Sequence, residues 1–137
     1  MATIALVQNK AIVRRLVEDV QVGGDFEVFD LLMDPGFVDH TPSPGFPPTR
    51  DGARELYHGF RKAFPDMTAT IEFQLAEGDL VTTRKIYFAT HKGAFLGIEP
   101  TGRSITFDVI DVLKVQGDVI TDHRGVMNIA KLLAQIS

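Results

Sequence analysis

Cysteine is absent from this sequence of 137 residues, and its absence excludes several kinds of chemistry at once. The chain can form no disulfide bridge, no thiolate metal site and no cysteine nucleophile. A chain without cysteine is typical of a reducing compartment, so we expect a cytoplasmic protein. The first ten residues lack a basic segment followed by an apolar run and therefore do not predict a signal peptide.

Charge of one sign and long apolar runs are also scarce. The net charge is only −4 with neutral histidines, and no basic run is present, so we do not expect a nucleic acid partner. No apolar stretch approaches the roughly 18 residues that a membrane span needs, so we do not expect a membrane partner either. The length and the ordinary hydrophobic content instead predict one folded domain over residues 1–137.

Several motifs of metal and phosphate chemistry are missing as well. The 4 histidines are scattered and show no HxH or HExxH spacing, so no metal site is predicted. Gly23 and Gly24 follow a helix and not a strand, so they do not form a phosphate-binding loop. None of the serines lies on a nucleophile elbow, and a Ser-His-Asp triad is not expected. The sequence thus predicts no metal and no cofactor.

Apolar residues at helical spacing indicate an N-terminal helix over about 6–22, because Val13, Leu16, Val17 and Val20 form one stripe. Asp25 is expected to cap a short second helix. Asp51 is expected to cap a third helix that ends at Pro65, and Asn128 is expected to cap a last one. Between the second and third helices, residues 41–48 contain four prolines, which predict a stiff loop at the rim of a pocket.

After Pro65 the apolar period changes from that of a helix to that of a strand. Strands are predicted over 68–75, 80–92, 104–115 and 119–127, and short turns between them predict antiparallel pairing. Helices gathered before the strands indicate an α+β fold. A curved sheet wrapped against those helices would enclose a small-molecule pocket on its concave side.

The last predicted hairpin carries the candidate catalytic residues. A three-residue turn at 116–118 would place Val112 opposite Asp122 and Ile110 opposite Arg124, whereas a two-residue turn would shift this pairing by one. Even-numbered residues would then share one face, where Asp108, Asp122 and Arg124 lie among aliphatic side chains. Charges on an apolar face are costly unless paired, so the trio is either a structural ion-pair network or a site for acid–base catalysis.

Histidines and aromatic residues are the candidates for substrate binding. His40 precedes the proline-rich loop and His91 ends a long predicted strand, so both could reach the pocket. Phe46, Tyr57 and Phe64 are expected to line the pocket or to belong to the core. His123 and Asp111 would face each other on the other side of the last hairpin, where we expect an outward cross-strand pair.

An ordered series of short motifs resembles the SnoaL-like polyketide cyclases of the NTF2-like superfamily. The matching phrases include 37–40 (FVDH), 63–66 (AFPD), 77–79 (EGD), 90–93 (THKG), 95–103 (FLGIEPTGR) and the terminal 122–123 (DH). The similarity extends over nearly the whole chain. It implies a cone-shaped α+β barrel, usually oligomeric, so a homodimer or homotetramer is expected.

The resemblance also implies a chemistry. Members of the family close rings in polyketides by intramolecular aldol condensation without a metal or a cofactor. An acid on the last strand removes a proton next to a carbonyl, and Asp122 matches that position. Asp108 matches by spacing an assisting residue of the preceding strand, and Arg124 would stabilise the enolate. His40 and His91 would hydrogen-bond substrate oxygens, and the substrate would be a small hydrophobic, oxygenated molecule.

Two alternatives remain open at this point. The superfamily also contains limonene-epoxide-hydrolase-like enzymes, which use an Asp–Arg–Asp arrangement that Asp108, Asp122 and Arg124 could imitate. Other members bind small molecules without catalysis. The leading hypothesis is a cofactor-independent cyclase or isomerase.

Overall fold

The computed structural model of the chain describes residues 2–137. Its elements, in chain order, are α1 (Ala2–Arg15), the π-helical segment η1 (Leu16–Val22), α2 (Phe26–Leu32), β1 (Met33–Asp39), α3 (Arg50–Ala63), β2 (Thr68–Glu77), β3 (Leu80–Thr90), β4 (Ser104–Gln116), β5 (Val119–Met127) and α4 (Ile129–Ile136). This order confirms the α+β class predicted from the sequence.

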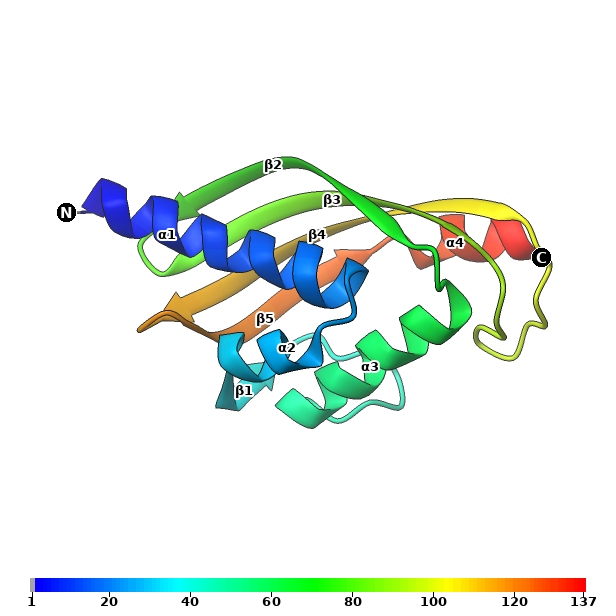
Figure 1. Cartoon of the computed structure of the whole chain (residues 1–137), viewed down its shortest axis with the longest axis horizontal. Coiled ribbons are helices and arrows are strands. Elements are labelled where there is room, and N and C mark those ends of the chain that lie inside the picture. Colours follow the sequence, from blue (N-terminus) through cyan, green and yellow to red (C-terminus); the bar gives the residue numbers. More distant parts are fainter. Residues whose placement is uncertain (1) are drawn as a thin grey trace.

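The strands form one curved, unclosed sheet in the order β1-β5-β4-β3-β2. β1 runs parallel to β5, and the other neighbours are antiparallel. The helices α1, α2 and α3 lie on one side of this sheet, and α4 lies near the beginning of β4 (Figure 1). The sheet therefore has an inner face, which the helices cover, and an outer face.

Side chains alternate between these two faces along the long strands. In β3 the odd-numbered residues from Val81 to Ala89 are buried, whereas the even-numbered residues are half-buried or exposed. The inner face packs into two apolar clusters, one around Phe29 of α2 and the other around Phe64 and Phe107. The space between the sheet and α3 holds the site described below.

The hairpin between β4 and β5 differs from the prediction. Its turn has two residues, Gly117 and Asp118, with φ of 57° and 66°, as the tight hairpin turns that match strand twist require. A register shift between Lys114 and Val115 follows, and a bulge of this kind adds one residue to one strand. Arg124 consequently pairs with Val112, so the predicted pairing of Arg124 with Ile110 is wrong.

The helix caps confirm two predictions and correct a third. The side chains of Asp25 and Asn128 accept hydrogen bonds from the backbone N–H groups of Val28 and Lys131, as N-caps do. The third helix begins two residues earlier than predicted, because the hydroxyl of Thr49 accepts a hydrogen bond from the backbone N–H of Gly52 at 3.3 Å. Thr49, and not Asp51, is therefore its N-cap.

We expect Thr49→Ala to lower the free energy of unfolding by about 1 kcal/mol, since the N–H of Gly52 loses its partner. Asp51→Ala keeps the cap and loses only a favourable charge in the first turn, so its cost should be about half as large or less. Urea unfolding of both variants at the same pH measures the difference. Equal losses would mean that the cap contributes nothing beyond helix charge.

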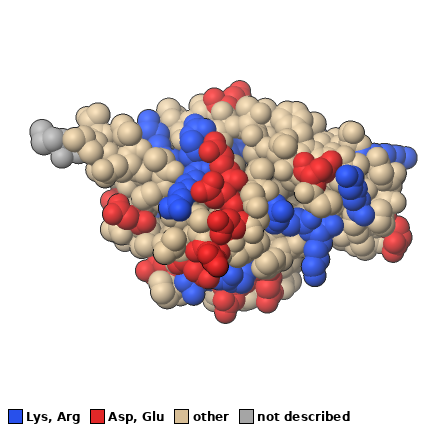
Figure 2. Space-filling model, in the orientation of Figure 1, with Lys and Arg blue, Asp and Glu red and all other residues tan. Residues whose placement is uncertain are grey.

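On the face shown in Figure 2, many of the acidic side chains form a band across the middle, with basic side chains on both sides of it. Where α1 meets η1, the i,i+4 pairs Arg14–Glu18 and Arg15–Asp19 form, and they contribute a few tenths of a kcal/mol each. None of the helices within residues 2–137 is long and apolar enough to cross a membrane.

Candidate functional site

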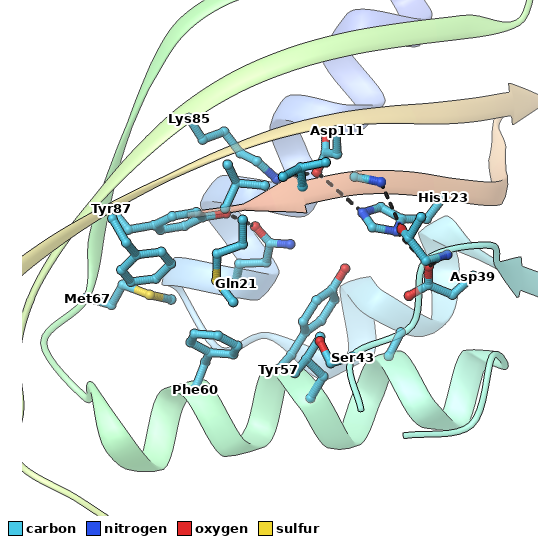
Figure 3. Close-up of a pocket in the computed structure, with 18 of the residues that line it drawn as sticks. Gln21, Asp39, Ser43, Tyr57, Phe60, Met67, Lys85, Tyr87, Asp111 and His123 are labelled. Atoms are coloured by element: carbon cyan, nitrogen blue, oxygen red, sulfur yellow. Dashed lines mark hydrogen bonds and ion pairs between the residues drawn. The ribbon is translucent and has the colours of Figure 1, made fainter. Parts of the chain in front are cut away.

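A cavity of about 150 Å³ lies between the inner face of the sheet and the helical segments η1 and α3. Aromatic side chains form two of its walls: Tyr57 and Phe60 project from α3, and Tyr87 lies opposite them on β3 (Figure 3). Thr41 and Val126 also line it and are exposed, so they mark its open side. The pocket that the curved sheet predicted is therefore present.

Four ionisable side chains from four different strands meet in this cavity: Asp39 of β1, Lys85 of β3, Asp111 of β4 and His123 of β5 (Figure 3). Lys85 Nζ lies 2.6 Å from Asp111 Oδ2. His123 Nδ1 lies 2.8 Å from Asp39 Oδ1, and its Nε2 lies 3.8 Å from Asp111 Oδ2. The histidine is thus held between two carboxylates, one of which also binds the lysine.

Strand pairing explains why these residues meet. The parallel pairing of β1 with β5 places Asp39 directly beside His123. Asp111 pairs with Gly125, one inward position along β5 from His123, and with Thr83, one inward position along β3 from Lys85. Diagonal neighbours on one face of a sheet are within reach of long side chains.

Gly125 provides the room for this cluster. A Cβ at this position would lie 2.9 Å from Asp111 Cβ and 2.9 Å from His123 Nε2, which is closer than non-bonded atoms approach. Any larger residue would displace the carboxylate or the imidazole. The glycine therefore keeps Asp111 and His123 in the same part of the cavity.

Mutual attraction keeps the side chains of His123, Asp111 and Asp39 in their charged forms. Burial alone would lower the pKa of His123, but its contacts with Asp111 and Asp39 outweigh burial and raise it to about 9. Burial alone would raise the pKa values of Asp111 and Asp39. The attraction of Lys85 and the contact with His123 keep that of Asp111 below its ordinary value, and His123 does so for Asp39. At neutral pH the site thus holds an imidazolium and two carboxylates.

The other ionisable side chains of the cavity keep their protons. Burial would lower the pKa of Lys85, but Asp111 beside it raises the pKa above its ordinary value. Burial raises the pKa of Tyr57 to about 12 and also raises that of Tyr87. Tyr87 donates a hydrogen bond to the side-chain oxygen of Gln21. Lys85 is therefore an ammonium and both phenols keep their protons at neutral pH.

One oxygen of the cluster has no partner. Asp111 is 3% exposed, and its Oδ1 accepts no hydrogen bond from any residue that the structure describes. A buried carboxylate oxygen without a hydrogen bond is unfavourable by more than 1 kcal/mol.

The structure places the three predicted catalytic residues outside the cavity. Asp108, Asp122 and Arg124 do share one face, as their parity predicted, but it is the outer face of the sheet, so their expected place in an enclosed pocket is wrong. Asp108 lies 3.5 Å from Arg84 and 3.7 Å from Lys131. Asp122 Oδ2 lies 2.7 Å from His40 Nε2, and Arg124 is exposed. The same three residues were the basis of the epoxide-hydrolase alternative.

Of the predicted binding residues, Tyr57 lines the cavity. His40 does not, because its ring binds Asp122 on the outer side. His91 and Phe64 are fully buried beside each other, with ring centroids 5.9 Å apart, and the Thr101 backbone N–H donates to His91 Nδ1. Phe46 is half-buried in the proline-rich loop and is not among the lining residues.

Sequence reasoning missed the Asp111–His123 pair as a site because it assigned that pair to the outward face. Two signals could have corrected the assignment. Lys85 is a lone charge at a position that alternates with Val81, Thr83 and Tyr87, which are buried, and a charge in such a row needs a carboxylate partner. Gly125 opposite Asp111 marks a place where side chains approach closely.

The cluster does not resemble a metal centre. Within residues 2–137, no group of three or more histidine, aspartate or glutamate side chains is arranged to hold a metal ion. Lys85 already occupies one oxygen of Asp111, and both Asp39 and Asp111 contact His123. The arrangement can donate a proton, accept one and stabilise a developing negative charge.

A family model of the SnoaL-like polyketide cyclases matches residues 11–136. The chain belongs to this family. We find no curated protein that matches the sequence significantly.

Solved structures agree with the assignment. IdmH from Streptomyces antibioticus, a proposed polyketide cyclase, is 31% identical over 93% of this chain and 97% of its own, with a TM-score of 0.82. AclR from Streptomyces galilaeus, a proposed hydroxylase, is 26% identical over 96% of this chain and 82% of its own, with a TM-score of 0.85. A proposed SnoaL-like polyketide cyclase from Jannaschia sp. CCS1 is 21% identical over 96% and 92%, with a TM-score of 0.84, and supports the fold alone. This SnoaL-like fold is the one that the sequence motifs predicted.

Proposed function

We propose that this SnoaL-like protein catalyses ring closure of an oxygenated polyketide-type substrate by acid–base chemistry, with Asp111 as the base and His123 as the acid. The observation that carries the proposal is the Asp111 carboxylate, which lines an aromatic cavity beside the imidazolium of His123. The family membership of the chain supports the reaction class.

In the first step the Asp111 carboxylate removes a proton from the carbon next to a substrate carbonyl. The electron pair of the broken C–H bond moves toward the carbonyl oxygen and forms an enolate. His123 Nε2–H hydrogen-bonds that oxygen, and the Lys85 ammonium adds positive charge close by. Donors aimed at a developing oxyanion in a dry site are worth several kcal/mol, which compensates for the weak basicity of a carboxylate whose pKa is lowered.

In the second step the enolate carbon attacks a second carbonyl carbon of the same chain. A carbon–carbon bond forms, and the attacked carbonyl becomes an alkoxide. The proton held by Asp111 passes to that alkoxide, so the base is regenerated and the cyclic product is an isomer of the substrate. No oxidant or reductant is needed. Asp39 holds His123 through Nδ1, so that Nε2, which lies on the Asp111 side of the ring, is the nitrogen left to donate to the reacting oxygen.

The proposal is tested by washout of deuterium from the α-deuterated ketone 1-phenylpropan-2-one into ordinary water, followed by mass spectrometry. This ketone reports the first step alone. After subtraction of the buffer rate, we expect the protein-catalysed rate to be level from about pH 6 to 8. Above pH about 9 it should fall about tenfold per pH unit, because His123 loses the proton that makes it an acid.

The other ionisable groups that face His123 do not titrate in this range. Asp39 and Asp111 are ionised, Lys85 is protonated, and the pKa of Tyr57 is about 12. His123→Gln should remove the fall above pH 9 together with most of the rate. His40→Gln is the matched control, since His40 contacts a carboxylate on the outer side, and it should keep the wild-type profile. A rate that rises through pH 9 would reverse the assigned roles, and no washout above buffer would refute the proposal.

A further inference from the structure

The helical wall of the cavity carries a hydroxyl that the two steps above do not use. Tyr57 projects from α3, and its hydroxyl is directed toward the sheet and the charged cluster (Figure 3). Tyr57 is half-buried, whereas Asp111 and Lys85 are buried. Its ring is held by an edge contact with Phe29, with ring centroids 5.8 Å apart. Tyr57 therefore presents a fixed polar group to the cavity.

Gln21 determines how this hydroxyl is used. It lies in the π-helical segment η1, and segments of this kind are frequent at functional sites. Its side-chain oxygen accepts a hydrogen bond from Tyr87, so its amide nitrogen is the group left for Tyr57. Contact with Gln21 lowers the pKa of Tyr57, as a donor to the phenol oxygen does. The oxygen of Tyr57 thus faces a donor, and its O–H is left to donate elsewhere.

The hydroxyl of Tyr57 keeps its proton at neutral pH. Burial raises the pKa of Tyr57 to about 12, and Lys85 and Asp111 act on it through their charges alone. A protonated phenol donates one hydrogen bond. The partner that this position favours is an acceptor such as a carbonyl oxygen.

An aldol ring closure has two oxygens that gain negative charge. In the proposed reaction His123 and Lys85, on the sheet, stabilise the first of them, the enolate oxygen. The second is the oxygen of the carbonyl that is attacked, and it belongs to a different part of the substrate. Because the donors of the sheet serve the first oxygen, the second needs a donor from another wall. Tyr57 lies on the helical wall, opposite the sheet (Figure 3).

We propose that Tyr57 is a further catalytic residue, whose hydroxyl hydrogen-bonds the carbonyl oxygen that the enolate carbon attacks. When the carbon–carbon bond forms, the π electron pair of that carbonyl moves onto its oxygen, and the hydrogen bond from Tyr57 stabilises the alkoxide. The proton held by Asp111 then passes to the alkoxide, so Tyr57 ends the reaction with its own proton. The inference rests on the proposed function for the identity of the attacked carbonyl. It specifies a substrate with two carbonyl groups, one for each wall.

Heptane-2,6-dione is the probe, because removal of an α-proton and attack on the other carbonyl close a six-membered ring. In deuterium oxide, mass spectrometry measures deuterium uptake and NMR measures ring closure. Tyr57→Phe keeps the ring that contacts Phe29 and removes only the hydroxyl. Loss of one oxyanion donor costs about 100- to 1,000-fold, so the ratio of ring closure to deuterium uptake should fall at least about 100-fold. Damage to the cavity alone would slow both processes.

Thr82→Val is the matched control, since it removes a hydroxyl from a half-buried position on the outer face of β3. It should keep the wild-type ratio of ring closure to deuterium uptake. An unchanged ratio in Tyr57→Phe would overturn the inference. An equal fall in both variants would also overturn it, because the effect would then not belong to Tyr57.

A second measurement does not depend on turnover. The diketone is labelled with ¹³C at both carbonyls, because a hydrogen bond moves the resonance of a carbonyl carbon to lower field. Spectra of the bound diketone are recorded directly after mixing. We expect its carbonyl resonance at higher field in Tyr57→Phe than in the wild-type protein. The same resonance position in both proteins would overturn the inference.

Failure of this inference and failure of the proposed function give different results. A carbonyl resonance that depends on Tyr57, without deuterium uptake above buffer, would refute the cyclase proposal and leave the hydrogen bond from Tyr57 to a ligand carbonyl. Deuterium uptake with the same rate of ring closure in Tyr57→Phe would leave Asp111 as the base and refute the role of Tyr57.

Discussion

Asp111→Asn should lower the rate of deuterium washout from 1-phenylpropan-2-one by at least about 100-fold at pH 7, which is the usual contribution of a positioned general base. The amide that replaces the carboxylate cannot take the proton. Lys85 and His123 remain in place, so the oxyanion donors are retained and only the base is lost. The rate is measured by mass spectrometry at a fixed protein concentration.

Two other aspartates provide matched controls. Asp108→Asn and Asp122→Asn remove the same charge from the outer face, where these residues pair with Arg84 and His40. Both should keep the wild-type rate within about twofold, as expected of surface substitutions. If Asp122→Asn instead lost the activity and Asp111→Asn kept it, the sequence-based assignment of the base would be right and the cavity-based one wrong.

Because Asp111→Asn leaves the Lys85 ammonium without its carboxylate, the folded fraction of each variant is measured by circular dichroism at the assay temperature. Rates are then compared per folded molecule. If the folded Asp111→Asn protein retains full activity, Asp111 is not the base. If no protein in the series washes out deuterium faster than buffer, the proposed cyclase chemistry is refuted.

Lys85→Met should lower the free energy of unfolding by about 3–5 kcal/mol, because it leaves the Asp111 carboxylate buried without its main partner. Lys85 is 1% exposed and Asp111 is 3% exposed, so water does not compensate for the lost charge. The methionine has nearly the same length as the lysine stem, so packing changes little. Urea unfolding at pH 7 measures the loss.

The double variant Lys85→Met/Asp111→Leu separates the charge effect from packing. Replacing both members of a buried ion pair with apolar side chains of similar size is often neutral or stabilising. We therefore expect the double variant to recover most of the stability that Lys85→Met loses, while remaining inactive. A loss in the double variant equal to that of Lys85→Met would show that packing, and not the unpaired charge, is responsible.

The predictions for Asp111→Asn and Lys85→Met both concern the Lys85–Asp111 ion pair. The first concerns its role in the proposed reaction and the second its role in stability. The Lys85–Asp111 bond fixes the carboxylate that is proposed to accept the proton. An apolar pair could hold the sheet as well, but it could not accept a proton. The stability of the site and its proposed activity are thus expected to be separable by mutation.

The sequence predicted the arrangement of elements well because the relevant signals are local. The stripe of Val13, Leu16 and Val20, the cap at Asp25 and the strand alternation after Pro65 each depend on neighbours within a few positions. The stripe and the cap are present in the structure. The strand is present too, but a bulge between Ile71 and Phe73 reverses its alternation, so Phe73 and Leu75 are exposed. Thr49 was missed as a cap because Asp51 lies two residues away and has the same capping ability.

Which strand residues share a face of the sheet was also predictable, but which of the two faces the helices cover was not. Alternation assigns Asp108, Asp122 and Arg124 to one face, and assigns Asp111 and His123 to the other. Both faces carry apolar residues, since Phe88 and Ile110 lie outside and are exposed whereas Leu113 and Phe107 lie inside. Composition alone therefore could not tell which face the helices cover.

Only the tertiary structure decided that question, through contacts between residues far apart in the chain. The packing of η1 and α3 over one face turns Asp111 and Lys85 inward, and the parallel pairing of β1 with β5 brings Asp39 to His123 across 84 positions. The sequence by itself determined the α+β class, the strands and the parity of their side chains, because hydrogen bonding and alternation are local. The site required long-range packing, which no local pattern encodes.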